Sequence, residues 1–196
     1  MNDLQDAALS TSAVTTESVV EAVLFSTDEP VPAGKLAQIL GAGDADDVRD
    51  HVDALNQRYE SCGSSFRIES IAKGYQMLTL PVYHAWVSKL HKERADSRLS
   101  GAALETLAIV AYKQPVLRAD IEAIRGVAVG DILLRLRDMN LVRIVGRAEE
   151  IGRPLLYGTT THFLEVFGLP NLKDLPKLDS DNPDAVPRLV QPETPA

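Results

Sequence analysis

The alternation of apolar and polar residues from Leu99 to Gly168 predicts three short helices followed by two strands. Pro115 ends the first helix and Gly126 ends the second. The stretch LVRIVGRAEEIGRPLLYGTT then reads as two strands joined by a charged turn. The residues expected to face inward are Leu104, Leu107, Ala108 and Ala111 in the first helix and Val129, Ile132, Leu133 and Leu136 in the third. Three helices and a hairpin follow one another in this order in a winged helix-turn-helix.

A weaker copy of the same pattern lies between Thr16 and Leu80. A first helix starts near Thr16 or Ser18, a short second helix ends at Gly41, and a strand pair turns near Lys73 and Gly74. The expected inward positions are Val19, Val20, Val23 and Leu24, then Leu36, Ile39 and Leu40, then Val48, Val52, Leu55 and Tyr59 on a helix from about Asp46 to Glu60. The chain is therefore expected to be α+β and mainly helical, with two tandem winged-helix domains.

The domain boundaries follow from this repeat and from composition. We expect a disordered N-terminus over residues 1–15, a first winged-helix domain over 16–95, a second over 96–169, and a proline-rich disordered tail over 170–196. Between the two domains, PVYHAWVSKLHKER reads as a helix. Its residue Trp86, with Val82, Val87 and Leu90 nearby, is expected to pack the helix onto its own domain.

The outward faces of the two third helices bear on nucleic-acid binding. In the first domain this face carries Asp46, Asp50 and Asp53 together with Gln57, where phosphates would meet carboxylates. In the second domain it carries Asp131, Leu134, Arg135 and Asp138. A winged-helix transcription regulator, the main alternative, needs Arg, Asn, Gln or Ser on such a face.

Charge and composition agree with this picture. The net charge is −8, and neither domain is the basic body expected of a self-sufficient DNA binder. The single cysteine, Cys62, suits a reducing cytoplasm, and the polar, acidic N-terminus does not resemble a signal peptide. No apolar run approaches the roughly 20 residues needed to cross a bilayer, so we expect no membrane contact.

Catalytic motifs are not found in the sequence. It contains no phosphate-binding glycine loop, GxSxG, HExxH or CxxC motif, and its four histidines fall on different predicted elements. We therefore expect no enzyme activity, metal, cofactor or small-molecule substrate. An enzyme that uses winged helices as accessory domains is the weakest of the three alternatives.

Protein binding remains as the expected function, and several residues are candidates for it. Leu134, Tyr112, Phe163 and Phe167 are candidate anchors for a partner, although Tyr112 and the two Phe residues could equally belong to the core. The valine-rich opening helix, with Val19, Val20 and Val23, is the candidate homodimer interface. In the wing, Arg143, Arg147 and Arg153 are candidates for weak DNA contact, offset by Glu149 and Glu150.

Longer stretches of the chain resemble a known family. LSGAALETLAIVAYKQPVLRADIEAIRGV and GRPLLYGTTTHFLEVFGLPNLKDLPKL, with EAVLFSTDEPVPAGKLAQIL and GYQMLTLPVY in the first domain, are similar to the bacterial segregation and condensation protein B family. The resemblance runs from about Val19 to Leu178. The residues that carry it in the second domain are Leu104, Glu105, Thr106, Ala111, Tyr112, Lys113, Gln114, Pro115, Arg118, Ile121, Arg125, Gly126, Gly146, Arg147, Gly152, Arg153, Pro154, Tyr157 and Gly158.

The resemblance implies an architectural role in chromosome condensation, segregation and partition. It implies a homodimer formed largely through the first domains and bound to the central region of the kleisin subunit, segregation and condensation protein A, and through it to SMC. It also implies a cytoplasmic protein associated with the nucleoid that meets DNA only within the complex. The chain departs from the family pattern at Leu117, where the second helix loses a side-chain N-cap, and at Ala128-Val129-Gly130.

Overall fold

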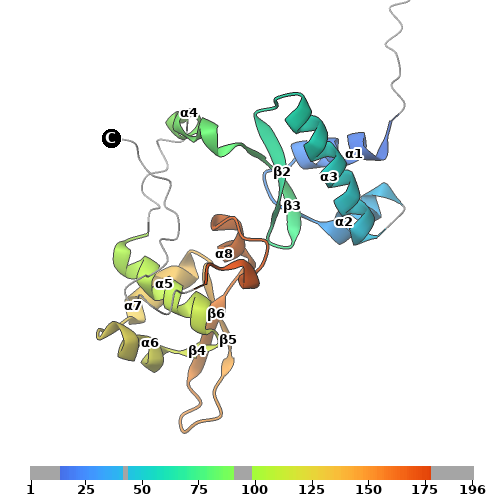
Figure 1. Cartoon of the computed structure of the whole chain (residues 1–196). Helices are drawn as coiled ribbons and strands as arrows, with labels where there is room; N and C mark the ends of the chain where they lie inside the picture. The colour runs from blue at the N-terminus through green and yellow to red at the C-terminus, as the bar shows by residue number, and fades with distance from the viewer. Residues whose placement is uncertain (1–13, 42–43, 91–98, 178–196) are drawn as a thin grey trace, which may run out of the picture. The chain divides into compact units, whose positions relative to one another are not determined.

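The computed structural model describes residues 14–41, 44–90 and 99–177. Contacts divide the chain into two compact units, the first within residues 1–69 and 73–81 and the second within 70–72 and 82–196. Figure 1 shows a group of helices beside a small sheet in each unit. The predicted N-terminal segment up to residue 13 and the tail beyond residue 177 lie outside the described residues.

The first unit alternates helices with short antiparallel strands. Its elements are α1 (Thr16–Phe25), β1 (Val31–Pro32), α2 (Ala33–Leu40), α3 (Ala45–Ser61), β2 (Phe66–Ile71) and β3 (Gly74–Thr79). The strands form one sheet in the order β1-β3-β2, with Val31 opposite Tyr75. The core contains Val20, Leu24 and Leu36 together with the predicted stripe of α3, Val48, Val52, Leu55 and Tyr59.

Local sequence sets where these helices begin and end. Thr15 caps α1 in a reciprocal box with Ser18, one residue before the earlier of the two predicted starts. Asp44 accepts hydrogen bonds from the first backbone N–H groups of α3. Gly41, in the left-handed conformation, ends α2 where the sequence predicts it.

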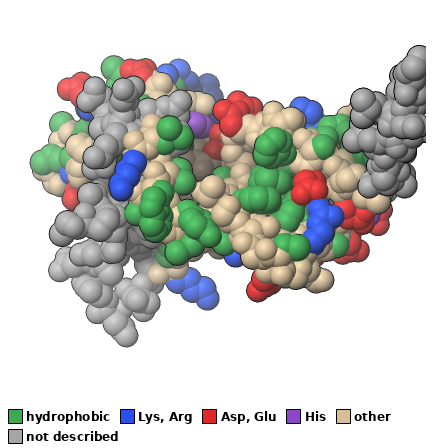
Figure 2. Space-filling view, turned by 90° about the horizontal axis from the view of Figure 1, so that it is seen from above, with side chains coloured by type: hydrophobic (Ala, Val, Ile, Leu, Met, Phe, Trp, Pro, Cys, Tyr) green, Lys and Arg blue, Asp and Glu red, His purple; other side chains and the backbone are tan. Residues whose placement is uncertain are grey.

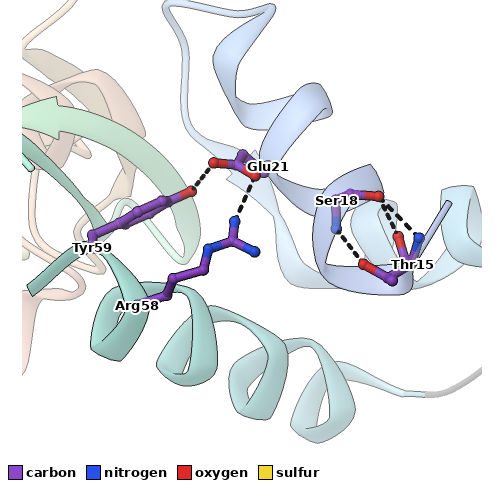
Figure 3. Close-up of polar contacts among 5 residues, drawn as sticks. All are labelled: Thr15, Ser18, Glu21, Arg58 and Tyr59. Carbon is purple, nitrogen blue, oxygen red and sulfur yellow. Dashed lines mark hydrogen bonds and ion pairs between the residues drawn. The ribbon is translucent and has the colours of Figure 1, made fainter. Parts of the chain in front are cut away.

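Two polar ties fix the rotation of α1 against α3. The Glu21 carboxylate accepts hydrogen bonds from Arg58 at 2.7 Å and from the Tyr59 hydroxyl at 2.9 Å (Figure 3). One turn earlier, His51 Nδ1 lies 2.9 Å from a Glu17 oxygen. Burial, followed by the hydrogen bond to Glu21, raises the pKa of Tyr59 to about 12. The face of α1 that carries these glutamates is therefore turned toward α3.

The second unit repeats the element order of the first. Its elements are α5 (Gly101–Lys113), β4 (Val116–Leu117), α6 (Arg118–Arg125), α7 (Gly130–Asp138), β5 (Val142–Arg147), β6 (Leu155–Thr159) and α8 (Thr161–Val166). The sheet order β4-β6-β5 matches β1-β3-β2 position by position. Each unit thus has a third strand of two residues, at β1 and β4, beyond the predicted hairpin. Two residues are too few to show an alternating pattern.

The core of the second unit lies between α5, α6, α7 and the sheet. Leu107, Ile121, Leu136 and Phe163 are fully buried there. The chain remains in contact with this unit beyond residue 169, because Leu175 packs against the core and the Tyr112 hydroxyl donates a hydrogen bond to the Pro176 carbonyl at 2.7 Å. A short 3-10 turn, η3 (Leu172–Asp174), precedes this contact.

The segment after β3 differs from the prediction. It consists of a 3-10 turn, η1 (Pro81–Tyr83), and a helix, α4 (His84–Leu90), and none of its residues is buried. Trp86 is 65% exposed, so it does not pack this helix onto its own domain. Ile39 of α2 is also exposed, contrary to its predicted inward position. Leu36 is the one buried residue of that helix.

Candidate partner-binding surface

The outward face of α7 is the first part of the candidate surface. Leu133 and Leu136 are buried, whereas Leu134 between them is 55% exposed, as its helical position predicts. Asp131 and Arg135 flank Leu134 and are exposed. An exposed leucine surrounded by charges has the composition of a small anchor with a polar rim, which is typical of protein interfaces.

Two further apolar side chains near α7 escaped sequence analysis. Ile124, near the end of α6, and Val127, in the turn that follows, are each about half exposed. Gly126 between them adopts the left-handed conformation that ends α6 and redirects the chain. The signal that could have identified Ile124 is the short length of α6, in which Ile121 is the one buried residue.

The aromatic candidates fall into different environments. Phe163 is fully buried in the core, so it is not available as a surface anchor. Phe167 is partly buried, with its ring 4.8 Å from that of Phe163 between centroids. Tyr112 is partly exposed, and its hydroxyl is engaged by Pro176. The short helix α8 buries Phe163 and Leu164 and leaves Val166 exposed.

The candidate dimer residues on α1 also differ in how deeply they are buried. Val20 is fully buried, Val23 is partly buried against the core of the first unit, and Val19 is half-buried. The side of α1 away from this core carries Ala22 and Phe25, both exposed. Val20 therefore lies inward, as the helical spacing predicts, and the assignment of Val19, Val20 and Val23 to a dimer interface stays a prediction.

The wing of the second unit is a solvated hairpin among the described residues. The three arginines are exposed; Arg143 donates to the Thr159 carbonyl at 3.3 Å and Arg147 to the Arg153 carbonyl at 3.2 Å. Glu149 and Glu150 are exposed on the same turn. The local charge is therefore nearly balanced, which gives phosphates little to bind.

The acidic face of α3 lies in solvent as predicted. Asp46, Asp50 and Asp53 are exposed, and Asp46 pairs with Arg49 at 2.8 Å. Figure 2 shows hydrophobic side chains gathered in patches on the surface, interspersed with acidic and basic groups. The acidic face of α3 repels the phosphates of a DNA backbone.

Several residues that carry the family resemblance form hydrogen bonds inside the second unit. The Gln114 side chain accepts a hydrogen bond from the Thr159 backbone N–H at 2.7 Å and donates to the Ala111 carbonyl at 3.2 Å. The Arg125 guanidinium, largely buried, donates to Thr106 Oγ1 at 2.6 Å and pairs with Glu105 at 3.0 Å. These bonds join β6 and α6 to α5, so this part of the motif maintains the scaffold that positions the surface.

The two departures from the family pattern lie at the starts of α6 and α7. Leu117, the N-cap residue of α6, makes no side-chain cap hydrogen bond, as expected, and Val129, the N-cap residue of α7, makes none either. Glu122 Oε1 accepts from the Val129 N–H at 3.0 Å and from Arg118 at 2.8 Å. These two bonds hold the pKa of Glu122 below its usual range. Glu122 thus supplies at the start of α7 the acceptor that the sequence there lacks.

Within residues 14–41, 44–90 and 99–177, no three His, Cys, Asp or Glu residues come together in a way that could hold a metal ion. No described helix combines the length and apolar character needed to cross a membrane.

Comparison with known proteins gives a consistent result. A family model described as "Segregation and condensation complex subunit ScpB" matches residues 18–178. Segregation and condensation protein B of Syntrophotalea carbinolica is 48% identical over 164 residues, covering 83% of this chain and 81% of that protein. The protein of the same name from Brevibacillus brevis is 44% identical over 162 residues, covering 82% and 83%.

Among solved structures, ScpB from Mycobacterium tuberculosis is 33% identical, covers 79% of this chain and 95% of its own, and gives a TM-score of 0.37. The family model spans most of the chain, and the curated relatives match it over four fifths of their own lengths. The chain therefore belongs to the ScpB family of segregation and condensation complex subunits.

Proposed function

We propose that this chain is a non-enzymatic architectural subunit of an SMC–kleisin complex that condenses and segregates the chromosome. It acts as a homodimer, binds the central region of the kleisin, and reaches SMC through that partner. It works in the cytoplasm on the nucleoid and meets DNA only inside the complex. Family membership and the protein-binding character of the surface support this proposal.

In this proposal the chain contains two winged helix-turn-helix domains with different tasks, built around the two compact units, and residues 82–95 are assigned to the first domain although contacts group them with the second unit. The first, residues 16–95, carries dimerisation, and the second, residues 96–169 with the contacts up to Pro176, binds the kleisin. Identical element order and identical three-stranded sheet order in the two units support the shared fold.

One observation carries the assignment of the kleisin site. In a DNA-reading winged helix the third helix presents hydrogen-bonding side chains to base edges. Here the exposed centre of α7 is Leu134, and Ile124 and Val127 add exposed apolar area on the preceding helix and turn. An amphipathic segment of the kleisin can bury such side chains.

Substitution of Leu134 tests this site directly. We expect Leu134→Glu to weaken binding of the purified kleisin at least thirtyfold, about 2 kcal/mol, because it places a charge at a desolvated anchor. Leu134→Ala removes the anchor without adding a charge and is expected to weaken binding to a smaller extent. Isothermal titration calorimetry measures both affinities.

The matched control is Ile151→Glu, which introduces the same charge at a fully exposed wing position. It is expected to bind the kleisin as the wild type does. Circular dichroism should show all three variants folded. Wild-type affinity in folded Leu134→Glu and Leu134→Ala would remove α7 from the interface while leaving membership of the family untouched.

A further inference from the structure

The strand β5 forms an open edge of the second sheet. It lies at one end of the order β4-β6-β5, so its outer edge pairs with no described strand. Ile144 and Val145 of β5 are 38% and 42% exposed, and Ile151, in the turn to β6, is fully exposed. Figure 1 shows the hairpin of β5 and β6 extending beyond the helices of its unit. An open edge with exposed apolar side chains can receive a strand from another chain.

The corresponding edge strand of the first unit, β2, is closed. The side-chain amide of Asn56 on α3 donates to the Ile68 carbonyl at 2.9 Å and accepts from the Ile68 N–H at 2.9 Å, as a neighbouring strand would. Ile68 and Ile71 are buried, and Arg67 pairs with Glu69 along the strand. Among the described residues, no side chain bonds to the backbone of β5 in this way. The repeat therefore contains one closed and one open copy of the same edge.

The backbone of Ile144 is directed toward the open edge. In an antiparallel pair, alternate residues bond to the neighbouring strand, and the residues between them direct their N–H and C=O groups outward. The Thr160 N–H donates to the Leu141 carbonyl at 3.2 Å, and these two residues lie opposite each other in the register that pairs Val142 with Thr159. Ile144, three positions after Leu141, therefore belongs to the outward set.

Arg147 lies at the other end of this edge. The Ala148 N–H donates to the Pro154 carbonyl at 2.9 Å, so the preceding residue, Arg147, also directs its backbone groups away from β6. A bulge at Val145 separates Ile144 and Arg147 by three positions instead of two. The open edge thus offers backbone donors and acceptors at two places, which suits a short added strand.

The charge of β5 selects the kind of segment that can be added. Arg143 and Arg147 are exposed, and the strand contains no acidic residue. Each guanidinium donates one bond to a carbonyl of its own hairpin and has further N–H groups. Glu149 and Glu150 lie in the turn, outside the strand. A second β5 placed on this edge would bring like charges together, whereas an acidic segment forms pairs of opposite charge.

We propose that β5 receives an added strand from another protein, supplied by a short extended segment in which acidic and apolar residues alternate. Its backbone bonds to Ile144 and Arg147. Successive side chains of a strand point to opposite faces, so Arg143 and Ile144 lie on different faces of the sheet. An alternating segment places its acidic side chains beside Arg143 and its apolar side chains beside Ile144. The inference is independent of the proposed kleisin site, which uses none of these residues.

A blocked hexapeptide of alternating glutamate and valine is the probe for the full chain. At saturating peptide, amide hydrogen exchange followed by NMR is expected to slow at least about tenfold at Ile144 and Arg147. The amide of Arg143, already bonded to β6, is expected to change little. These two positions distinguish an added strand from a peptide that contacts the side chains alone.

Two altered peptides separate backbone pairing from charge. A hexapeptide N-methylated at alternate residues keeps its side chains and loses donors on one edge. A hexapeptide with lysine in place of glutamate keeps its backbone and reverses its charge. Each is expected to bind at least about tenfold more weakly, a loss of about 1.4 kcal/mol.

Substitutions in the chain test the same charges. Arg143→Glu and Arg147→Glu are each expected to weaken binding of the glutamate peptide and to strengthen binding of the lysine peptide. Lys35→Glu is the matched control, because it makes the same change of charge at an exposed position of α2 in the first unit. This control is expected to bind both peptides as the wild type does.

Three results would overturn the inference. The first is unchanged exchange at Ile144 and Arg147 with about 1 mM glutamate peptide, a concentration at which even weak specific complexes form. The second is equal binding of the glutamate, lysine and N-methylated peptides. The third is protection of the same two amides that rises with chain concentration in the absence of peptide, which would identify a second copy as the occupant.

Discussion

At the scale of single residues, Gly74 shows how closely the backbone of the first unit is packed. A Cβ added there would lie 2.7 Å from the carbonyl oxygen of Val31 on the neighbouring strand β1. The obstacle is backbone rather than a flexible side-chain tip, so the strands would have to move apart. Glycine is therefore required at this position by close approach.

We expect Gly74→Ala to lower the free energy of unfolding by about 1–3 kcal/mol, the usual cost of forcing extra volume into a packed site. Urea unfolding followed by circular dichroism measures the change. Gly34→Ala is the control, because nothing lies within 4 Å of a Cβ added at that position in α2. It is expected to stabilise the helix by up to about 1 kcal/mol, and equal effects of the two changes would contradict the close approach.

At the scale of elements, the start of α7 depends on a carboxylate from α6. Glu122 accepts the Val129 N–H and the Arg118 side chain, and both bonds favour its charged form. Its pKa is therefore lower in the folded chain than in the unfolded one. A group with a lowered folded pKa contributes stability above its unfolded pKa, about 4.3 for glutamate, and that stability is lost as the pH falls through the folded value.

Glu122→Gln removes this titration and keeps an acceptor oxygen for Val129. We expect the urea midpoint of the variant to fall less steeply than that of the wild type between about pH 5 and pH 3. Arg118→Gln removes one of the two bonds and is expected to give an intermediate slope. Identical slopes in all three proteins would show that the Glu122 bonds do not contribute to acid stability.

At the scale of the whole molecule, net charge and its placement decide what the free chain can bind. The chain carries a charge of −8, and the exposed face of α3 adds Asp46, Asp50 and Asp53 where a DNA-reading helix would be basic. The arginines of the wing are few and are offset by neighbouring glutamates. The free chain is thus poorly suited to neutralise phosphates.

We expect the isolated protein to bind duplex DNA more weakly than about 1 µM at physiological salt, with any binding lost steeply as salt is added. Fluorescence anisotropy with an unrelated 30-base-pair duplex and with fragments of the host chromosome measures this. Nanomolar binding selective for one fragment would revive the transcription-regulator alternative.

The sequence by itself determined the order of the main helices and hairpins and the buried faces of the longer helices. Helical periodicity places Val48, Val52, Leu55 and Tyr59 inward in α3 and leaves Leu134 of α7 outward, and all five positions agree with the structure. Periodicity succeeds there because a long amphipathic helix has one apolar face and one core to bury it in.

Tertiary structure alone decided which apolar residues were covered at the margins of elements. The same apolar character is buried at Phe163 and open to solvent at Trp86, because α8 has a core beside it and α4 has none among the described residues. The two-residue strands β1 and β4, and the acceptor that Glu122 lends to α7, were likewise decided by neighbours distant in sequence. Spacing along the chain reports which side of an element is apolar, whereas burial depends on what other part of the molecule occupies that side.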